Sequence, residues 1–289
     1  MNYEGNIFRP PSEAHSILLQ VTTGCSHNKC TFCSMYKESR FSIKSDALIM
    51  ADIDFAARHC RHQKRLFLCD GDALILPHKR LVPILEAIRT KLPWVERVGT
   101  YANTRSIRRK SVGELKELHD LGLTIAYMGL ESGDDAILEA INKGSDAARM
   151  IEMGRKIRSA GIKLSITVIL GIAGTADSRR HAERSGQVLS AIDPEYVGAL
   201  SLMLSPGSEL HRRWEAGEFS LPGPREMLEE LHIMLRHTDL SDGYFHANHA
   251  SNYLPIKARL PGDKDSTLKL IEQALAGLID LRPEHMRGL

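Results

Sequence analysis

The sequence predicts an α/β protein: a partial (β/α)6 TIM-like barrel with a C-terminal extension. The first observation is that six short apolar runs alternate with amphipathic stretches, which is typical of parallel β-α-β units. The second is that glycines, carboxylates and thiols directly follow these runs, and loops at strand ends carry the chemistry of such barrels. A chain of 289 residues can form one such domain with an appendage.

Six strands and a matching series of helices follow from the pattern. The strands are expected over residues 16–22, 65–69, 97–101, 123–129, 163–170 and 196–203. The helices are expected over residues 45–60, 78–91, 111–121, 134–141 with 146–160, 177–191 and 224–236. Ser45 is an N-cap for the first helix, whose apolar face should include Ile53 and Phe55. Gly161 suits the position just after a helix end.

The alternation weakens after about residue 237. We therefore assign residues 1–240 to the core barrel and residues 241–289 to a C-terminal extension that covers the substrate. A final helix is expected from about residue 265 to residue 281. In the extension, His246 and His249 have H-x2-H spacing, but two ligands do not make a metal site. They suit either a substrate wall or structural packing.

Composition argues against several classes of protein. The net charge is +2 and aromatic residues make up 6%, so no basic, aromatic-rich surface for nucleic acid is indicated. The polar N-terminus is not a signal peptide, and no apolar run approaches the ~20 residues of a membrane span. We expect a cytoplasmic protein. Its five cysteines are clustered toward one end, which favours metal binding or catalysis over disulfides.

Three of these cysteines lie within residues 25–33, CSHNKCTFC, just after the first predicted strand. Thiolates are soft ligands that select zinc or iron–sulfur clusters. Three of them could hold three irons of a [4Fe–4S] cluster and leave the fourth open. A zinc site completed by His27 is the alternative, although structural zinc sites usually have two C-x2-C pairs and only Cys30 and Cys33 form one here. In a third interpretation, the three thiols bind no metal.

This loop resembles the cysteine motif of the radical S-adenosylmethionine (SAM) superfamily, C-x3-C-x2-C after the first strand of a partial (β/α)6 barrel. An aromatic residue usually precedes the last cysteine, as Phe32 does. The spacing from Cys25 to Cys30 is one residue longer than in the family motif. The resemblance implies that Cys25, Cys30 and Cys33 hold a [4Fe–4S] cluster and that SAM binds its fourth iron.

Turns after the second and third strands extend the resemblance. Residues 69–74, CDGDAL, occupy the place of the superfamily's G-G-E-P-like turn, so Gly71 and Asp72 are expected to receive the SAM amino group. An ordinary β-α turn is the alternative. Asn103, after the third strand, could hydrogen-bond a ligand, and capping a helix explains it equally well.

Stretches after the later predicted strands resemble motifs of methylthiotransferases and oxygen-independent coproporphyrinogen oxidases of the same superfamily. Glu131, in 128–133 MGLESG, is expected at the ribose hydroxyls, and Lys143 at the SAM carboxylate. Lys143 could also be a solvated lysine. Gly171 opens a glycine turn expected to contact adenine, and Thr167 is a further ribose contact.

The resemblance implies an enzyme that cleaves SAM to a 5′-deoxyadenosyl radical and abstracts hydrogen from a small-molecule substrate. Its electron donor would be a flavodoxin or ferredoxin. Radical methyl or methylthio transfer is the alternative within the superfamily, together with a member that binds SAM without turnover. A zinc-stabilised, non-catalytic binding protein is the alternative from another class. The substrate cannot be read from the sequence because a barrel does not define one.

Overall fold

The computed structural model describes residues 1–288, which form two compact units. The first unit comprises Met1–Asn28, Met35–Met128 and Arg155–Leu164. The second comprises Lys29–Ser34, Gly129–Gly154 and Ser165–Leu289. The two units are defined by the contacts within each of them. No boundary between them lies near residue 240. The roles assigned to residues 1–240 and 241–289 stay predictions.

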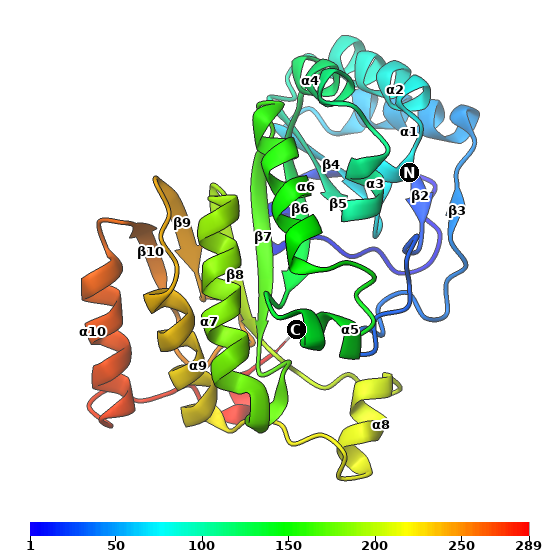
Figure 1. Cartoon of the computed structure of the whole chain (residues 1–289). Coiled ribbons are helices and arrows are strands. Elements are labelled where there is room, and N and C mark those ends of the chain that lie inside the picture. Colours follow the sequence, from blue (N-terminus) through cyan, green and yellow to red (C-terminus); the bar gives the residue numbers. More distant parts are fainter. Residues whose placement is uncertain (289) are drawn as a thin grey trace. The chain divides into compact units, whose positions relative to one another are not determined.

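The first unit contains parallel strands in the order β1 (Ile17–Gln20), β4 (Arg65–Cys69), β5 (Arg97–Ala102) and β6 (Leu123–Glu131), with β6 leaving the unit after Met128. Figure 1 labels its helices α1 (Asp46–His59), α2 (His78–Lys91), α3 (Thr104–Arg108) and α4 (Val112–Asp120), and α6 (Ala147–Ser159) ends in this unit. Short elements complete it: η1 (Pro11–Glu13), η2 (Ala73–Ile75) and the antiparallel pair β2 (Thr22–Thr23) and β3 (Ser42–Ile43).

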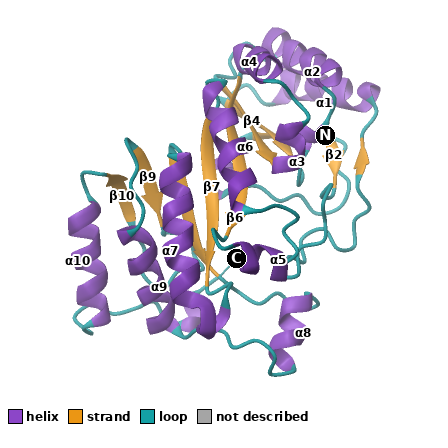
Figure 2. Cartoon of the chain, viewed as in Figure 1, coloured by secondary structure: helices purple, strands orange, loops and turns teal. Residues whose placement is uncertain are grey.

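The second unit continues the strand–helix alternation, as the colours of Figure 2 show. Strands β7 (Lys163–Leu170), β8 (Tyr196–Ser201) and β9 (Gly243–His246) run parallel, and β10 (Lys257–Leu260) pairs antiparallel with β9. Its helices are α5 (Asp135–Ala140), α7 (Gly174–Ile192), α8 (Glu209–Glu215), α9 (Pro224–Arg236), α10 (Lys264–Leu275) and η3 (Glu284–Met286). Helix α9 lies between α7 and α10 (Figure 1).

Burial alternates along β7, which accounts for its place in a helix-covered sheet. Ile166, Val168 and Leu170 are buried, whereas the residues between them are only half-buried. The same alternation holds in β8 and β9, where Val197 and Phe245 are buried. One side of these strands therefore carries the apolar core, and the other side stays partly open.

Most predicted elements are confirmed. The bounds predicted for β4, β7, α2 and α9 match the structure, and the Ser45 side chain accepts from the Leu48 N–H as an N-cap does. Gly161 has a positive φ of 84°, as expected just after a helix end. The predicted apolar face of α1 was wrong at Phe55, which is 36% exposed, whereas Ile49 and Ile53 are fully buried.

Several short elements were not predicted, among them β3, α3, α8, β9 and β10. They span two to seven residues, too few for a period to stand out from the surrounding polar sequence. The last helix ends at Leu275 instead of residue 281, because Gly277 takes a φ of 76°. Among residues 1–288, no helix is both long enough and apolar enough to cross a membrane.

Candidate functional site

Gly71, Asp72, Asn103, Glu131 and Gly171 lie at or just after the carboxyl ends of strands, whereas Thr167 lies within β7 and Lys143 follows α5. In the first unit the predicted site residues are Cys25, Gly71, Asp72 and Asn103, which follow β2, β4 and β5. In the second they are Cys30, Phe32, Cys33, Glu131, Lys143, Thr167 and Gly171. Carboxyl ends of neighbouring parallel strands meet at one edge of a sheet, so in the first unit the residues after β4 and β5 lie close together.

Cys25 lies directly against the turn after β4. The Gly71 N–H donates to the Gly24 carbonyl oxygen at 3.1 Å. A Cβ atom at Gly71 would come within 2.8 Å of the Cys25 Cβ and 3.0 Å of its Cα. Only glycine permits such a close approach of Cys25 to residue 71. The start of the cysteine loop therefore packs against the predicted SAM turn.

Asp72 is fully buried, and its two carboxylate oxygens have different surroundings. Oδ2 accepts from the Ser26 hydroxyl at 2.6 Å and from the Asn103 amide at 2.8 Å. Oδ1 is also buried and meets no hydrogen-bond partner among residues 1–288. Burial raises the pKa of Asp72 to about 6, although the hydrogen bond from Ser26 opposes the shift. A buried acceptor without a donor is costly, and it suits a ligand that brings one.

Asn103 caps α3 and also holds Asp72. Its Oδ1 accepts from the Ser106 N–H at 2.9 Å, and a reciprocal bond from the Asn103 N–H to the Ser106 hydroxyl completes a capping box. Its Nδ2 is the donor to Asp72. Capping, one of the two readings open from the sequence, is therefore confirmed, and the amide N–H serves the Asp72 carboxylate.

In the second unit, the backbone of Thr31 fastens the rest of the cysteine loop. The Thr31 N–H donates to the Ile141 carbonyl oxygen at 3.0 Å, and its own carbonyl accepts from Leu210 N–H at 2.9 Å. Phe32 packs on a buried apolar cluster that includes Ile141 and Leu210. The residues between Cys30 and Cys33 are thus fixed by α5 and α8, and the aromatic residue anchors them by packing.

Glu131 and Lys143 form an ion pair with 2.8 Å between Oε1 and Nζ, and both side chains are largely buried. Glu131 has a φ of 64°, an uncommon left-handed conformation for a residue with a side chain. A side chain at Gly129 would collide with the Glu131 carboxylate and approach Lys143 Nζ to 3.0 Å. Because Gly129 has no side chain, the oppositely charged groups of Glu131 and Lys143 can lie next to it at the end of β6.

Thr167 and Gly171 have different surroundings. Thr167 lies on the half-buried side of β7, beside Gly198 of β8. Gly171 has a φ of 82°, and its N–H donates to Glu230 Oε1 at 2.6 Å. Met227 of α9 occupies the space near a Gly171 Cβ, at 2.8 Å. The glycine here permits the close approach of α9.

The three cysteines of the loop are each half-buried, with Cys25 in the first unit and the other two in the second. Among residues 1–288, no three His, Cys, Asp or Glu side chains are grouped as a metal site. The ligand assignment therefore stays a prediction. The donor set fits iron–sulfur chemistry, because thiolates are the soft ligands that hold such clusters.

Asn28 forms a bend within the C-x4-C segment between Cys25 and Cys30. Its φ is 46°, and its side-chain amide donates to the Tyr36 carbonyl oxygen at 2.6 Å. Asparagine tolerates this left-handed conformation better than most residues. The loop thereby takes up one residue in a tight bend.

Within residues 1–288, the histidines of the C-terminal part are not grouped with other His, Cys, Asp or Glu side chains as a metal site. Burial and Lys257 lower the pKa of His246, and burial and Arg282 lower that of His249. His249 Nδ1 lies 2.9 Å from the Ser251 hydroxyl. Both shifts favour the neutral form of the imidazole ring at pH 7.

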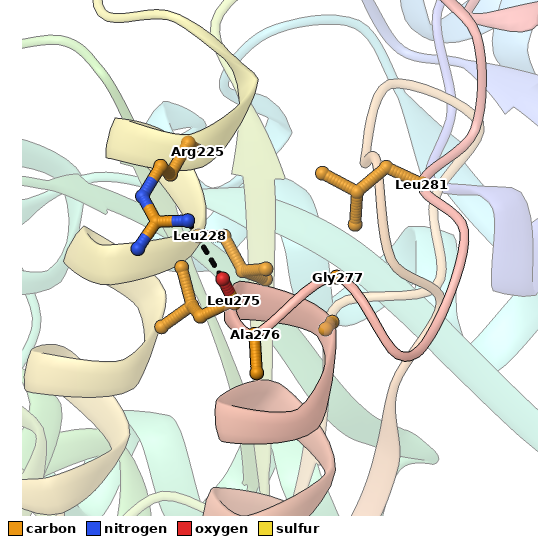
Figure 3. Close-up of a pocket in the computed structure, with 7 residues that line it drawn as sticks. Arg225, Leu228, Leu275, Ala276, Gly277 and Leu281 are labelled. Carbon is orange, nitrogen blue, oxygen red and sulfur yellow. Dashed lines mark hydrogen bonds between the residues drawn. The ribbon is translucent and has the colours of Figure 1, made fainter.

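A hollow of about 230 Å³ lies between α9 and the end of α10 (Figure 3). The Arg225 guanidinium there donates to the Leu275 carbonyl oxygen at 2.6 Å. None of the residues that line the hollow is a predicted site residue: Arg225, Leu228, Ala274, Leu275, Ala276, Gly277 and Leu281. We assign it to helix packing.

Sequence reasoning overlooked several residues that shape the site. Ser26 holds Asp72, and Asp70, with a φ of 65°, accepts from Gln20 at 2.7 Å; burial raises the pKa of Asp70 to about 6. The D-G-D spacing around Gly71 was a signal for Asp70. Glu230 had no signal, because it contacts Gly171 across 59 positions of sequence.

Parallel β-α units with a thiol loop and glycine turns at their strand ends define an α/β protein of the partial-barrel class. A sequence model of the radical SAM superfamily matches residues 19–183, more than half of the chain. The chain belongs to the radical SAM superfamily, whose members are enzymes that generally use a [4Fe–4S] cluster and SAM.

Individual relatives are distant. The chain is 23% identical to 4′-phospho-dehydrooxetanocin synthase of Priestia megaterium over 201 residues, which cover 62% of this chain and 27% of the relative. The structure of methylornithine synthase matches with a TM-score of 0.54 and 13% identity, over 78% of this chain and 63% of that one. Coproporphyrinogen III oxidase of Escherichia coli matches with a TM-score of 0.55 and 14% identity, over 76% and 51%.

These likenesses confirm the predicted fold class, a partial TIM-like barrel. Because the sequence identities are so low, these similarities do not show that the proteins catalyse the same reaction. The chain also spans less than two thirds of the length of each of these three proteins.

Proposed function

We propose that the protein is a radical SAM enzyme that cleaves SAM to a 5′-deoxyadenosyl radical and removes a hydrogen atom from a small-molecule substrate. Cys25, Cys30 and Cys33 would hold the [4Fe–4S] cluster. When bound, that cluster supplies the electron for SAM cleavage, delivered by a flavodoxin or ferredoxin.

The observation that carries this proposal is the buried Oδ1 of Asp72, which meets no hydrogen-bond partner among residues 1–288. Ser26, the residue after Cys25, orients the other oxygen of the same carboxylate. A ligand at the cysteine loop that brings an N–H donor would satisfy Oδ1, and the amino group of SAM is such a donor.

The remaining contacts to SAM are proposed from the resemblance to the superfamily. Glu131 would accept hydrogen bonds from the ribose hydroxyls, and Lys143 would meet the SAM carboxylate. Their ion pair holds both side chains in defined positions at the end of β6. Thr167 would add a ribose contact, and the turn from Gly171 would meet adenine.

Anaerobic reconstitution tests the cluster. The wild-type protein should bind about four irons per chain. Cys25→Ala, Cys30→Ala and Cys33→Ala should each lose the brown chromophore. Cys60→Ala is the matched control, because Cys60 is a half-buried thiol at the end of α1 and outside the loop. A complete cluster in Cys30→Ala would disprove the ligand assignment, and bound zinc in place of iron would favour the zinc-stabilised binding protein.

The reaction is tested by reducing the reconstituted protein in the presence of SAM. We expect 5′-deoxyadenosine and methionine. S-adenosylhomocysteine as the main product would indicate methyl transfer instead. An intact cluster with bound SAM and neither product would identify a member that binds SAM without turnover.

A further inference from the structure

A buried network of polar side chains joins two turns of the second unit. One turn ends β6 and contains Glu131 and Ser132, and the other follows β7 and begins at Gly171. The residues that join them are His181 of α7 and Glu230 of α9, which are 0% and 1% exposed. Neither belongs to a motif in the sequence.

Glu230 holds the Gly171 turn from α9. Its Oε1 accepts from the Gly171 N–H at 2.6 Å, and its Oε2 accepts from the hydroxyl of Ser178 on α7. A charge-assisted bond to a backbone N–H is stronger than a neutral one. The left-handed backbone of Gly171 is therefore held by a carboxylate that the chain supplies 59 positions later.

His181 extends the network to the Glu131 turn. Its Nε2 lies 3.3 Å from Glu230 Oε1, and its Nδ1 lies 2.8 Å from the Ser132 hydroxyl. The Ser132 hydroxyl also accepts from the Asp134 N–H at 3.1 Å. His181 Nδ1 hydrogen-bonds with the Ser132 hydroxyl, whereas Nε2 approaches Glu230 Oε1 without hydrogen-bond geometry, so the two turns are linked by a chain of buried polar contacts.

A second set of contacts places the Glu131 turn tightly against α7. The Gly133 N–H donates to the Ser185 hydroxyl at 2.8 Å. A Cβ atom at Gly133 would collide with the backbone of Arg184. Movement of α7 or of His181 therefore displaces the residues that follow Glu131.

Burying a carboxylate and an imidazole is expensive unless every donor and acceptor is matched. Apolar side chains would pack α7 against α9 at less cost, but they could not hold two backbone turns in one arrangement. The contacts of Glu230 with the Gly171 turn and of His181 with Ser132 therefore favour a positioning role over simple packing.

We propose that Glu230 and His181 are positioning residues that hold the Glu131 and Gly171 turns in one arrangement, and so orient the adenosine half of SAM. This inference rests on the proposed function, which assigns ribose to Glu131 and adenine to the Gly171 turn. It predicts that the network acts on adenosine binding and leaves the methionine half, held by the cysteine loop, unaffected.

The test compares Glu230→Leu, which removes both acceptor oxygens, with Glu230→Gln, which keeps one. In reconstituted protein, Glu230→Leu should weaken binding of SAM and of 5′-deoxyadenosine about tenfold and change methionine binding less than twofold. Glu230→Gln should restore binding to within about threefold of wild type. Hydrogen exchange of the unreconstituted protein should accelerate in Glu230→Leu at both residues 129–135 and residues 169–176.

Glu13→Leu is the matched control. Glu13 is a buried carboxylate of the first unit that accepts from Ser16, Tyr127 and Arg97. Its loss should accelerate exchange in the first unit and leave both turns of the second unchanged. If Glu230→Leu does not fold, His181→Phe serves instead and should accelerate exchange at residues 129–135.

Three results would overturn the inference: unchanged exchange at residues 129–135, equal weakening of SAM and methionine, or the same turn effects in Glu13→Leu. If the reconstituted wild-type protein bound no SAM, the proposed function would fail, and the assignment to adenosine with it. Hydrogen exchange would still decide whether the two turns are coupled.

Discussion

The buried charge of Asp72 lowers the stability of the folded protein, and it lies where the proposed SAM site needs a hydrogen-bond acceptor. Its carboxylate is fully buried, and only one of its oxygens has hydrogen-bond donors among residues 1–288. Lys110, also buried, donates to the carbonyl oxygens of Leu74 and Leu76, and burial lowers its pKa to about 8. The Asp72 charge is thus held mainly by neutral donors, which is why burial dominates its pKa.

Asp72→Asn should stabilise the protein at pH 7.5 while weakening SAM binding. The unfolded-state pKa of Asp is about 3.9, and the folded value is raised to about 6. The folded state therefore holds more protons between about pH 4 and pH 6, and the free energy of unfolding falls as pH rises through this window. Removing the charge should raise that free energy at pH 7.5 by up to about 2–3 kcal/mol, at 1.36 kcal/mol per pKa unit.

Urea unfolding of the wild type and of Asp72→Asn at pH 7.5 and at pH 4 checks this prediction. The difference in the free energy of unfolding between the two proteins should be smaller at pH 4. Asp70→Asn is a comparison for stability alone: burial also raises the pKa of Asp70 to about 6, so this variant should be stabilised similarly. A loss of stability in Asp72→Asn at pH 7.5 would contradict the electrostatic account.

Asn28 should be replaceable by glycine but not by valine. A β-branched residue at its φ of 46° is strained by roughly 1–2 kcal/mol. We expect Asn28→Val to reduce iron bound after reconstitution, and Asn28→Gly to stay near wild type despite losing the bond to Tyr36. Equal iron content in both variants would show that the bend is not needed.

At the scale of elements, glycines decide how closely segments pack around the site. Gly71 permits the cysteine loop to touch the β4 turn, and Gly133 permits the β6 turn to touch α7. The long amphipathic segments α2 and α9 were predicted with their observed bounds because burial of one helix face imposes a period on the sequence. Strands β9 and β10, each four residues long, carry too short a pattern.

Gly133→Ala should lower the free energy of unfolding by about 1–3 kcal/mol, because overpacking forces backbone shifts. The added methyl group would collide with the carbonyl of Arg184 in α7. Gly198→Ala is the control, since its Cβ would meet nothing closer than 3.7 Å. Urea denaturation measures both, and equal stability of the two variants would count against the close contact.

At the scale of the whole molecule, the end of the chain braces a loop that follows β9. Arg282 donates to the carbonyl oxygens of His249, Ala250 and Asn252. Arg287 donates to Ser251 and to Leu202, and its guanidinium lies 4.1 Å from the centre of the Tyr253 ring. The histidine-bearing loop is therefore ordered by residues more than 25 positions later.

Arg287→Ala should loosen this loop and lower stability by about 1–3 kcal/mol, because buried carbonyl oxygens lose their donor. Hydrogen exchange at residues 247–253 should accelerate. Arg259→Ala is the control, because that exposed guanidinium pairs only with Asp242 among the side-chain carboxylates of residues 1–288. No change in exchange at residues 247–253 would show that Arg287 does not brace the loop.

The sequence by itself determined the alternation of strands and helices, the cysteine loop and the glycine turns. These depend on neighbouring residues: the period of a buried face, a capping serine such as Ser45, or the thiols of residues 25–33. That information was enough for the fold class and for superfamily membership.

Only the tertiary structure decided which partners these residues meet. It gave Asp72 one oxygen with donors and one without, paired Glu131 with Lys143, and brought Glu230 to Gly171. Such contacts join residues 12 to 59 positions apart, and no local period records them. The physical reason is that burial forces each polar group to find a partner, while the choice of partner depends on how helices and strands pack.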